Sequence, residues 1–399
     1  MRIIFTTWAW PSHLYAMVPV AWACRSSGHE VLVASQPELT DTISLTGLPA
    51  APIGRDVDAV AIFRDIVLAP PPAKRPQAGG PQADGPRAGG PQAGGPRVLG
   101  LLVELAEAMV DDLIELAAEW RADLIVFDPT AFAGPLAAAA LGIPAVRHLY
   151  GTDLMSVVGR FLPSALGPLC EKRGLDAVDP FGVATVDPCP DGLQVPVASR
   201  RLPVRYMAHN GPGLLPPEFR ARSGRPRVCV TWGTTMSRLD PGLFLAGDVA
   251  RAISGLEVDV VVAVTAGQRA LLGELPPEVT VVESAPLHLL LPACDLVVAH
   301  GGAGTLLTAL ANGLPQLLIP RLPDHVRHAG RLAEVGAAAV LAAPVHEPSM
   351  IRAQLTELLT TPAYRAAARR LQREMADQPS PALLVPELES LATRATAQL

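Results

Sequence analysis

The chain has 399 residues, which allows two or three domains or one large one. Hydrophobic residues make up 49% and charged residues 18%, yet no apolar run reaches the roughly 18–20 residues of a membrane-spanning helix. The net charge of −6 argues against a nucleic-acid binder, since such proteins are usually basic. We therefore expect neither a membrane nor a nucleic acid among the partners.

The N-terminus and the cysteines indicate a cytoplasmic protein. Residues 1–5 lead directly into a strand-like run without a small-residue cleavage site, so no signal peptide is expected. The five cysteines contain no Cys-x-x-Cys pair and are odd in number. This pattern favours reduced thiols over a disulfide framework or a structural zinc site.

The first half of the chain alternates apolar strands with helices, an order that indicates a parallel sheet covered on both faces. Strands are expected at 2–7, 30–34, 123–127 and 145–148, and helices at 14–27, 98–121 and 132–141. Pro19 predicts a kink or break in the first of these helices. The apolar, glycine-containing stretch 155–169 is a further candidate for helices.

A Gly/Pro-rich insert interrupts this half at 70–96. It repeats Gly-Gly-Pro-Gln-Ala and has almost no apolar side chain. Such a segment buries too little surface to offset the entropy lost on ordering, so we predict a disordered surface loop. A substrate lid and a docking site for a partner are the functional alternatives.

A second series follows the Pro/Gly-rich stretch 210–217. Its strands are expected at 227–232, 258–264, 279–282, 296–299, 316–319 and 338–341, and its helices at 243–253, 287–293, 305–312, 325–334, 350–360 and 363–378. Two doubly wound α/β domains fit this order, with a ligand in the cleft beyond the carboxyl ends of the strands. We expect an N-terminal domain at 1–209, a linker at 210–226, a C-terminal domain at 227–378 and a tail at 379–399. Packing of the tail against the N-terminal domain is one option.

The most informative motif is Asp-Leu-Val-Val-Ala-His-Gly-Gly-Ala-Gly-Thr at 295–305. An apolar strand ends there in a glycine-rich turn that opens a helix. Glycines let the backbone approach an anion, and the first N–H groups of a helix lie at its positive end. A diphosphate fits such a turn, and a tight strand–helix connection without a ligand is the alternative. The spacing matches neither the Rossmann fingerprint nor the P-loop.

Several ordered motifs together resemble the family 1 glycosyltransferases. His-Gly-Gly-Ala-Gly-Thr at 300–305 is preceded by Ala-Pro-Leu-His at 285–288 and followed by Pro-x-x-Pro-Asp-His at 320–325, as in that family's donor-binding signature. Segments 5–13 and 210–213 are similar to the bacterial branch that glycosylates antibiotics and other polyketides. The resemblance implies the GT-B fold, an α/β architecture of two doubly wound Rossmann-like domains that face each other across a cleft. The N-terminal domain would bind the acceptor and the C-terminal domain the nucleotide sugar.

The resemblance also implies a catalytic pair. In this family a histidine after the first strand deprotonates the acceptor hydroxyl, and an aspartate that ends a later strand orients it. The matching positions are His13 and Asp128. A neutral imidazole can act as a base near pH 7, and a carboxylate on its other nitrogen fixes the tautomer. The alternatives are a surface residue at a helix start and a turn former before Pro129. Trp8 and Trp10 would line the acceptor pocket or belong to the core.

The donor site carries over residue by residue. Hydroxyl, imidazole and backbone groups would hold the diphosphate, at Thr234, His300, Gly302, Gly304 and Thr305. The base would meet Ser284 and the backbone of Ala285 and Leu287, and the sugar hydroxyls would meet Asp324 and His325. A helix N-cap is the alternative role for Asp324.

Three departures from the family pattern leave the base and the sugar open. Ser284 stands where an aromatic residue often stacks on the base, His325 where glutamine is frequent, and His328 where asparagine is usual. The Asp-Val-Asp sequence at 56–58 lies in the wrong domain for a metal at the donor. A metal-independent mechanism is therefore implied, in which helix ends and hydroxyls stabilise the leaving diphosphate.

The resemblance implies an inverting glycosyltransferase of antibiotic biosynthesis that has no cofactor and no metal. It would move a deoxysugar from a dTDP- or UDP-sugar to a hydrophobic polyketide-type acceptor. The alternatives are a non-catalytic nucleotide-sugar-binding or auxiliary protein and a GT-B nucleotide-sugar epimerase. The sequence leaves open an O- or a C-glycoside, an auxiliary activator protein, and a monomer or a homodimer.

Overall fold

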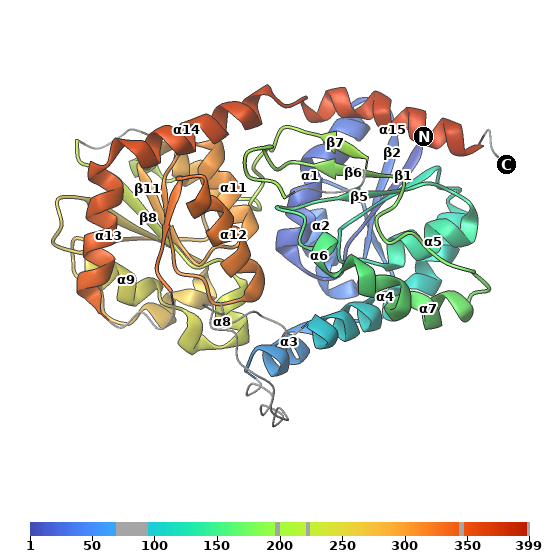
Figure 1. Ribbon diagram of the computed structural model, residues 1–399, viewed down its shortest axis with the longest axis horizontal. Helices are drawn as coiled ribbons and strands as arrows, with labels where there is room; N and C mark the ends of the chain where they lie inside the picture. The colour runs from blue at the N-terminus through green and yellow to red at the C-terminus, as the bar shows by residue number, and fades with distance from the viewer. Residues whose placement is uncertain (69–94, 196–199, 221–223, 343–346, 397–399) are drawn as a thin grey trace, which may run out of the picture.

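The computed structural model describes residues 1–68, 95–195, 200–220, 224–342 and 347–396 (Figure 1). Two α/β units lie side by side, and the C-terminal helices run across both (Figure 1). Residues 70–94 of the expected insert lie outside the described residues, and its last two residues begin helix α4.

The first unit is built on a seven-stranded parallel sheet in the order β3-β2-β1-β4-β5-β6-β7. The chain moves outward from β1 to β2 and β3, and then returns to place β4 on the other side of β1. This reversal is the switch point at which open α/β sheets bind ligands. The strands are β1 (Arg2–Thr6), β2 (Glu30–Ser35), β3 (Ala50–Pro52), β4 (Leu124–Phe127), β5 (Ala145–His148), β6 (Ala184–Asp187) and β7 (Arg201–Pro203).

The second unit repeats this plan with a six-stranded parallel sheet in the order β10-β9-β8-β11-β12-β13. Its switch point lies between β8 and β11, which pair directly. The expected pair of doubly wound α/β units is therefore confirmed. The strands are β8 (Arg227–Thr231), β9 (Asp259–Val264), β10 (Thr280–Glu283), β11 (Leu296–Ala299), β12 (Gln316–Leu318) and β13 (Ala338–Val340).

Helices cover both faces of each sheet. Successive residues of β1 enter different cores, with Ile3 and Phe5 in one cluster and Ile4 in another, because side chains alternate along a strand. The helices of the first unit are α1 (Pro11–Ser26), α2 (Thr40–Ser44), α3 (Ala59–Leu68), α4 (Gly95–Glu119), α5 (Ala133–Leu141), α6 (Met155–Val158) and α7 (Leu162–Glu171). Those that follow are α8 (Thr235–Leu239), α9 (Ala246–Ile253), α10 (Leu287–Leu290), α11 (Ala303–Ala311), α12 (Pro323–Glu334), α13 (Pro348–Thr360), α14 (Pro362–Asp377) and α15 (Pro381–Thr396). None of the helices in the described ranges is long and apolar enough to cross a bilayer.

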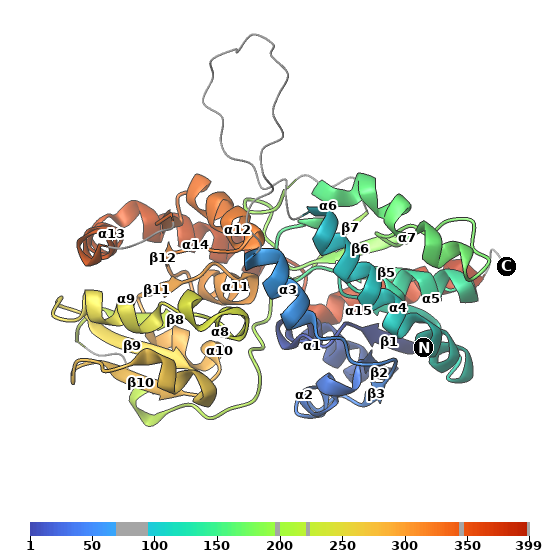
Figure 2. The ribbon, with the colours of Figure 1, turned by 90° about the horizontal axis from the view of Figure 1, so that it is seen from below.

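The two units touch at several places. Helix α3 of the first unit packs against α8 of the second (Figure 2). Near the C-terminus, α14 packs on α11 and α15 packs on α1, so the last two helices belong to different units. Between α14 and α15 the chain is held by two hydrogen bonds. The N–H of Arg205 donates to the carbonyl of Pro379 at 2.7 Å, and the Gln378 amide donates to the carbonyl of Cys189 at 3.1 Å.

Several local features differ from the sequence-based expectations; helices α2, α3, α8 and α15, for example, were not expected. Pro19 lies buried within α1, which continues past it to Ser26, so no break occurs there. A single proline removes only one backbone hydrogen bond of the helix. The helix expected at 243–253 starts as a 3₁₀ turn at Pro241–Leu243 and becomes regular only at Ala246. Strands β3, β6 and β7 were not expected, because their sequences, Ala-Ala-Pro, Ala-Thr-Val-Asp and Arg-Leu-Pro, contain no continuous run of strand-forming residues.

The contact between α15 and α1 can be tested by truncating one side chain. Leu388 is fully buried in the cluster that joins the two helices, so Leu388→Ala should cost about 2–5 kcal/mol of stability and lower the melting temperature. Leu383, on the same helix, is 67% exposed, and Leu383→Ala should change stability by less than about 0.5 kcal/mol. Equal melting curves for the two variants would show that α15 does not stabilise the first unit.

Candidate active site

Both switch points open onto one cavity between the two units. Its volume is about 860 Å³, within the range of sites for small-molecule ligands. With the exception of Asp128, every residue that the sequence assigns to a site lines this cavity: Trp8, Trp10, His13, Thr234, Ser284, Ala285, Leu287, His300, Gly302, Gly304, Thr305, Asp324 and His325. Asp128 lies behind His13 and is 1% exposed.

His13 and Asp128 meet because β1 pairs with β4. His13 lies in the first turn of α1, which begins soon after β1, and Asp128 directly follows β4. The Nδ1 atom of His13 lies 3.0 Å from Oδ2 of Asp128, and the His13 side chain is 13% exposed. The pair can therefore take up a proton from the cavity on Nε2 and stabilise the resulting charge from behind.

Thr130 completes this arrangement. Its hydroxyl and its backbone N–H both donate to Oδ1 of Asp128, the N–H at 2.9 Å, so each oxygen of the carboxylate has a separate partner. The same hydroxyl accepts the indole N–H of Trp8 at 2.8 Å. Sequence reasoning missed Thr130, although a hydroxyl residue two positions after a turn aspartate is a common local hydrogen-bond pattern.

Aromatic rings surround the imidazole. Tyr150, which follows β5, stacks on His13 with ring centroids 4.2 Å apart and an interplanar angle of 29°. Trp8 meets His13 edge-on, with ring centroids 5.2 Å apart, and lies tilted by 36° against Trp10, with ring centroids 4.9 Å apart. Both tryptophans are 8% exposed and belong to a core cluster, so the core role is confirmed; they also line the cavity, and their acceptor-binding role stays a prediction. Arg238 of α8 lies over the Trp10 ring at 4.9 Å and links the second unit to this wall.

The turn after β11 is built around the ring of His300. A Cβ on Gly302 would lie 2.5 Å from Nε2 of His300, and a Cβ on Gly233 would lie 2.6 Å from its Cε1. The buried imidazole is therefore held between two glycines, and no larger residue fits at either position. Burial, and then the charge of nearby His325, lower the pKa of His300 well below its usual value, so the ring is neutral at pH 7.

Several hydrogen-bond donors of the second unit border the cavity close to one another. Gly302 precedes α11, whose first N–H groups have no carbonyl partner within the helix. Thr305 lies in the first turn of α11, and Thr234 immediately precedes α8. Two helix starts and two hydroxyl groups thus border the cavity, an arrangement that suits an anion.

The segment before α10 is held in an unusual backbone conformation. Ser284 has φ +56°, a region that non-glycine residues rarely adopt, and its N–H donates to the carbonyl of Val264 at 2.8 Å. Asn210 of the linker accepts the N–H of His288 at 2.9 Å and so caps α10. Gly213 packs so closely that a Cβ there would lie 2.2 Å from the ring of Pro286. The linker therefore shapes the wall at Ser284, Ala285 and Leu287.

The structure corrects the N-cap alternative for Asp324. Leu322 occupies the N-cap position of α12, and Asp324 lies within its first turn because the helix begins at Pro323. Although burial alone would raise its pKa, neighbouring His325 and His328 and two backbone N–H groups hold the pKa of Asp324 below its usual value. The His325 ring meets His300 edge-on at 4.7 Å, and burial lowers the pKa of His325 despite Asp324.

Comparisons with known proteins agree with this geometry. Two family models match the chain, the N-terminal domain of erythromycin biosynthesis protein CIII-like proteins over residues 22–233 and their C-terminal domain over 248–391. Tylactone mycaminosyltransferase of Streptomyces fradiae is 35% identical over 98% of this chain and 92% of its own length. The 10-deoxymethynolide desosaminyltransferase of Streptomyces venezuelae is 33% identical over 99% of this chain and 98% of its own.

Two solved structures share the whole fold. The glycosyltransferase VinC, solved in complex with dTDP, superposes with a TM-score of 0.81 at 32% identity and covers 99% of this chain and 100% of its own. Spinosyn rhamnosyltransferase SpnG, solved with spinosyn aglycone, gives a TM-score of 0.82 at 31% identity and covers 98% of this chain and 100% of its own.

The buried histidines of the second unit predict a pH-dependent stability. His328 is 2% exposed, and burial lowers its pKa from 6.5 to about 4. The unfolded chain therefore binds a proton below pH 6.5 that the folded chain binds only near pH 4, so stability is lost as pH falls through this window. His328→Asn should remove up to about 3 kcal/mol of that loss.

Urea unfolding at several pH values between 7.5 and 4 measures this effect. The curves for wild type and His328→Asn should have the same slope against pH above 6.5 and diverge below it. Curves that stay parallel down to pH 4 would show that His328 is protonated equally in both states.

Proposed function

The chain belongs to the erythromycin biosynthesis protein CIII-like family and is a glycosyltransferase of natural-product biosynthesis, and we propose that it transfers a deoxysugar from a dTDP-sugar to a polyketide-type aglycone. The observation that carries this proposal is the cavity itself. One wall holds the His13–Asp128 pair, and the opposite unit contributes the anion-binding turn at His300 to Thr305. Base and leaving-group site therefore face a single volume.

The proposed reaction is a single displacement. The acceptor oxygen bonds to C1 of the sugar while the bond from C1 to the diphosphate oxygen breaks. The hydroxyl proton passes to Nε2 of His13, since Nδ1 faces Asp128 at 3.0 Å. The buried carboxylate stabilises the imidazolium that forms. Attack from the face opposite the diphosphate inverts the configuration at C1.

The leaving diphosphate would be stabilised by fixed donors of the second unit. The first N–H groups of α11 and the hydroxyl groups of Thr305 and Thr234 border the cavity. Such preorganised dipoles stabilise developing negative charge without a further reorganisation cost. We propose that they suffice without a metal or another cofactor. The complex of VinC with dTDP supports a thymidine diphosphate donor in this family.

The acceptor would bind in the apolar part of the cavity. Helices α3, α4 and α6 contribute only aliphatic, aromatic and thioether side chains to it among the described residues: Ala59, Phe63, Ile66, Val98, Leu99, Leu101, Leu102, Met155 and Val158. This wall fits a hydrophobic aglycone, and the complex of SpnG with spinosyn aglycone supports that class of acceptor. The five cysteines are free and buried, which suits the cytoplasm as the site of the reaction.

The donor turn can be tested with two glycine variants, one inside the turn and one away from the cavity. Gly302→Ala should abolish dTDP binding, because the new Cβ collides with the His300 ring at 2.5 Å. Gly330→Ala is the control, since a Cβ there meets no atom within 4 Å and Gly330 does not line the cavity. dTDP at 100 times its dissociation constant stabilises a protein by roughly 2.7 kcal/mol, a shift that thermal melting detects. Equal melting shifts in both variants would place the diphosphate elsewhere.

The catalytic pair can be tested by turnover. His13→Ala should lower kcat about 10²- to 10⁴-fold in a dTDP-sugar assay against a panel of polyketide aglycones, because the general base is lost. Asp128→Asn should also lower kcat, while both variants keep the melting shift with dTDP. Wild-type protein that binds dTDP but glycosylates no acceptor would favour the non-catalytic alternative. Conversion of the nucleotide sugar without an acceptor would favour the epimerase.

A further inference from the structure

The segment that follows β5 touches three parts of the cavity at once. The ring of Tyr150 stacks on His13. Gly151 approaches the donor helix so closely that a Cβ there would lie 2.8 Å from Cβ of Ala303. Met155 begins α6 and lines the acceptor wall. The position of this segment, 149–155, therefore affects base, donor helix and acceptor wall together.

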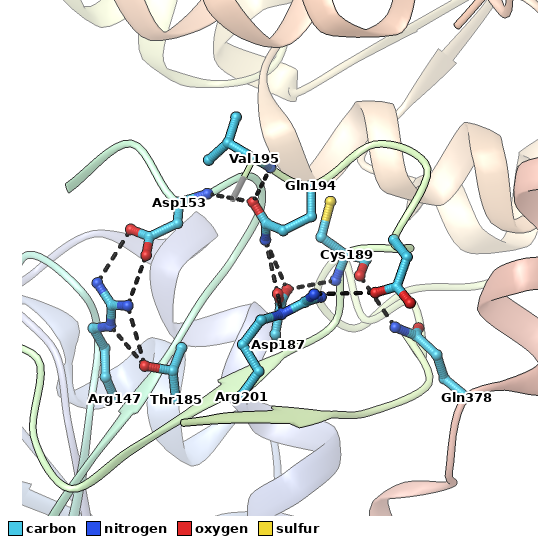
Figure 3. Close-up of polar contacts among 10 residues, drawn as sticks. Arg147, Asp153, Thr185, Asp187, Cys189, Gln194, Val195, Arg201 and Gln378 are labelled. Carbon is cyan, nitrogen blue, oxygen red and sulfur yellow. Dashed lines mark hydrogen bonds and ion pairs between the residues drawn. The ribbon is translucent and has the colours of Figure 1, made fainter. Parts of the chain in front are cut away.

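Asp153 anchors the segment through a bidentate ion pair (Figure 3). Its two oxygens accept from Nη1 and Nη2 of Arg147 at 3.1 and 2.7 Å, and both side chains are completely buried. Oδ1 of Asp153 also accepts the N–H of Ser156 at 3.2 Å, within the first turn of α6. One carboxylate thus fixes both the loop and the helix that follows it.

A second layer of contacts holds the pair in place (Figure 3). The guanidinium of Arg147 donates twice to the hydroxyl of Thr185 at 3.1 Å. The side-chain oxygen of Gln194 accepts the N–H of Asp153 at 2.8 Å, and its amide nitrogen donates to both oxygens of Asp187, at 3.0 and 2.8 Å. The geometry of Asp153 is therefore set by residues of strands β5 and β6 and by the loop that contains Gln194.

Such a network contributes little to the free energy of folding, because the desolvation cost of two buried charges is about as large as the energy of their attraction. Its main effect is to fix one geometry, since the planar guanidinium of Arg147 binds the carboxylate in a single bidentate arrangement. Tyr150 lies in the same segment, three positions before Asp153. A displacement of segment 149–155 would therefore move the Tyr150 ring away from the face of His13.

We propose that Asp153 is a positioning residue that, through the Arg147 pair, holds Tyr150 against the catalytic base. This rests on the proposed role of His13. The aromatic ring keeps the imidazole oriented between Asp128 and the cavity, and its face favours the positive charge that the ring acquires during transfer. Loss of Asp153 and loss of the Tyr150 ring should therefore have the same effect on His13, and the second loss should add nothing to the first.

The test is a double-mutant cycle read by NMR on the full chain labelled with ¹³C at Cε1 of histidine. The chain has nine histidines, and the His13 signal is the one absent from His13→Ala. Stacking under Tyr150 shifts this signal by a ring current, which Tyr150→Leu should abolish. Asp153→Asn should move the signal in the same direction, and the double variant should coincide with Tyr150→Leu. Asp191→Asn is the matched control, because this carboxylate pairs with Arg201 at the exposed end of the network and should leave the signal unmoved.

Kinetics provide the second readout. Asp153→Asn should lower kcat roughly ten- to a hundredfold, a larger change than in KM for the dTDP-sugar. Its pH profile should coincide with that of Tyr150→Leu. If Asp153→Asn does not fold, Arg147→Lys takes its place, since it keeps the buried charge but loses the fork.

A His13 signal that stays at its wild-type position in Asp153→Asn, or shifts that add in the double variant, would overturn the proposal. The NMR cycle needs no substrate, so its outcome is separate from the outcome of the transfer assay. Absence of turnover in the wild type with the expected NMR cycle would reject the proposed function and leave the positioning of His13 by Asp153 in place.

Discussion

The pairing of β1 with β4 is the constraint on which the site depends. It brings His13 and Asp128, 115 positions apart in the sequence, to a distance of 3.0 Å. The same switch point places Thr130 on the carboxylate and Trp8 on Thr130. Since Asp128 is buried, its charge would be costly without these partners. The geometry of the His13–Asp128 pair is thus part of the core of the first unit and not an addition to its surface.

The second unit has the same topology, but its switch point carries two glycine-containing turns instead of a histidine–carboxylate pair. Its switch point lies between β8 and β11, and each of these strands ends in a glycine-containing turn that opens a helix. Gly233 and Gly302 enclose the His300 ring, so the two turns are fitted to each other. A neutral buried imidazole and two helix starts make the two turns themselves polar without a formal charge, whereas Arg238, Arg321 and Asp324 bring charges to other parts of the wall. The helix starts can contribute to anion binding through their partial positive charge.

The relative position of the units is fixed by groups far apart in the sequence. Asn210 of the linker caps α10 beside the donor wall, and Arg238 of the second unit lies over Trp10 of the first. At the opposite end, Gln378 bonds to the carbonyl of Cys189 where the chain returns towards α15. The cavity is therefore shaped by both segments that connect the two units, the linker and the segment between α14 and α15. The proposed transfer, with acceptor and donor held by different units, would require this, since the reacting atoms must come within bonding reach.

The sequence by itself determined the alternating α/β order, most strand positions and the local signals of function, because the turn at 295–305 and the segment 5–13 are continuous motifs. It also identified His13 and Asp128 through resemblance. Only the tertiary structure decided which residues surround them. Trp8 donates to Thr130, Tyr150 stacks on His13 and Arg147 donates to Thr185 because the strands that carry or precede these residues lie together in the sheet, in the order β1-β4-β5-β6, although the residues are distant in the chain. Short strands such as β7 were decided in the same way, since pairing at the sheet edge, rather than any local pattern, makes them extended.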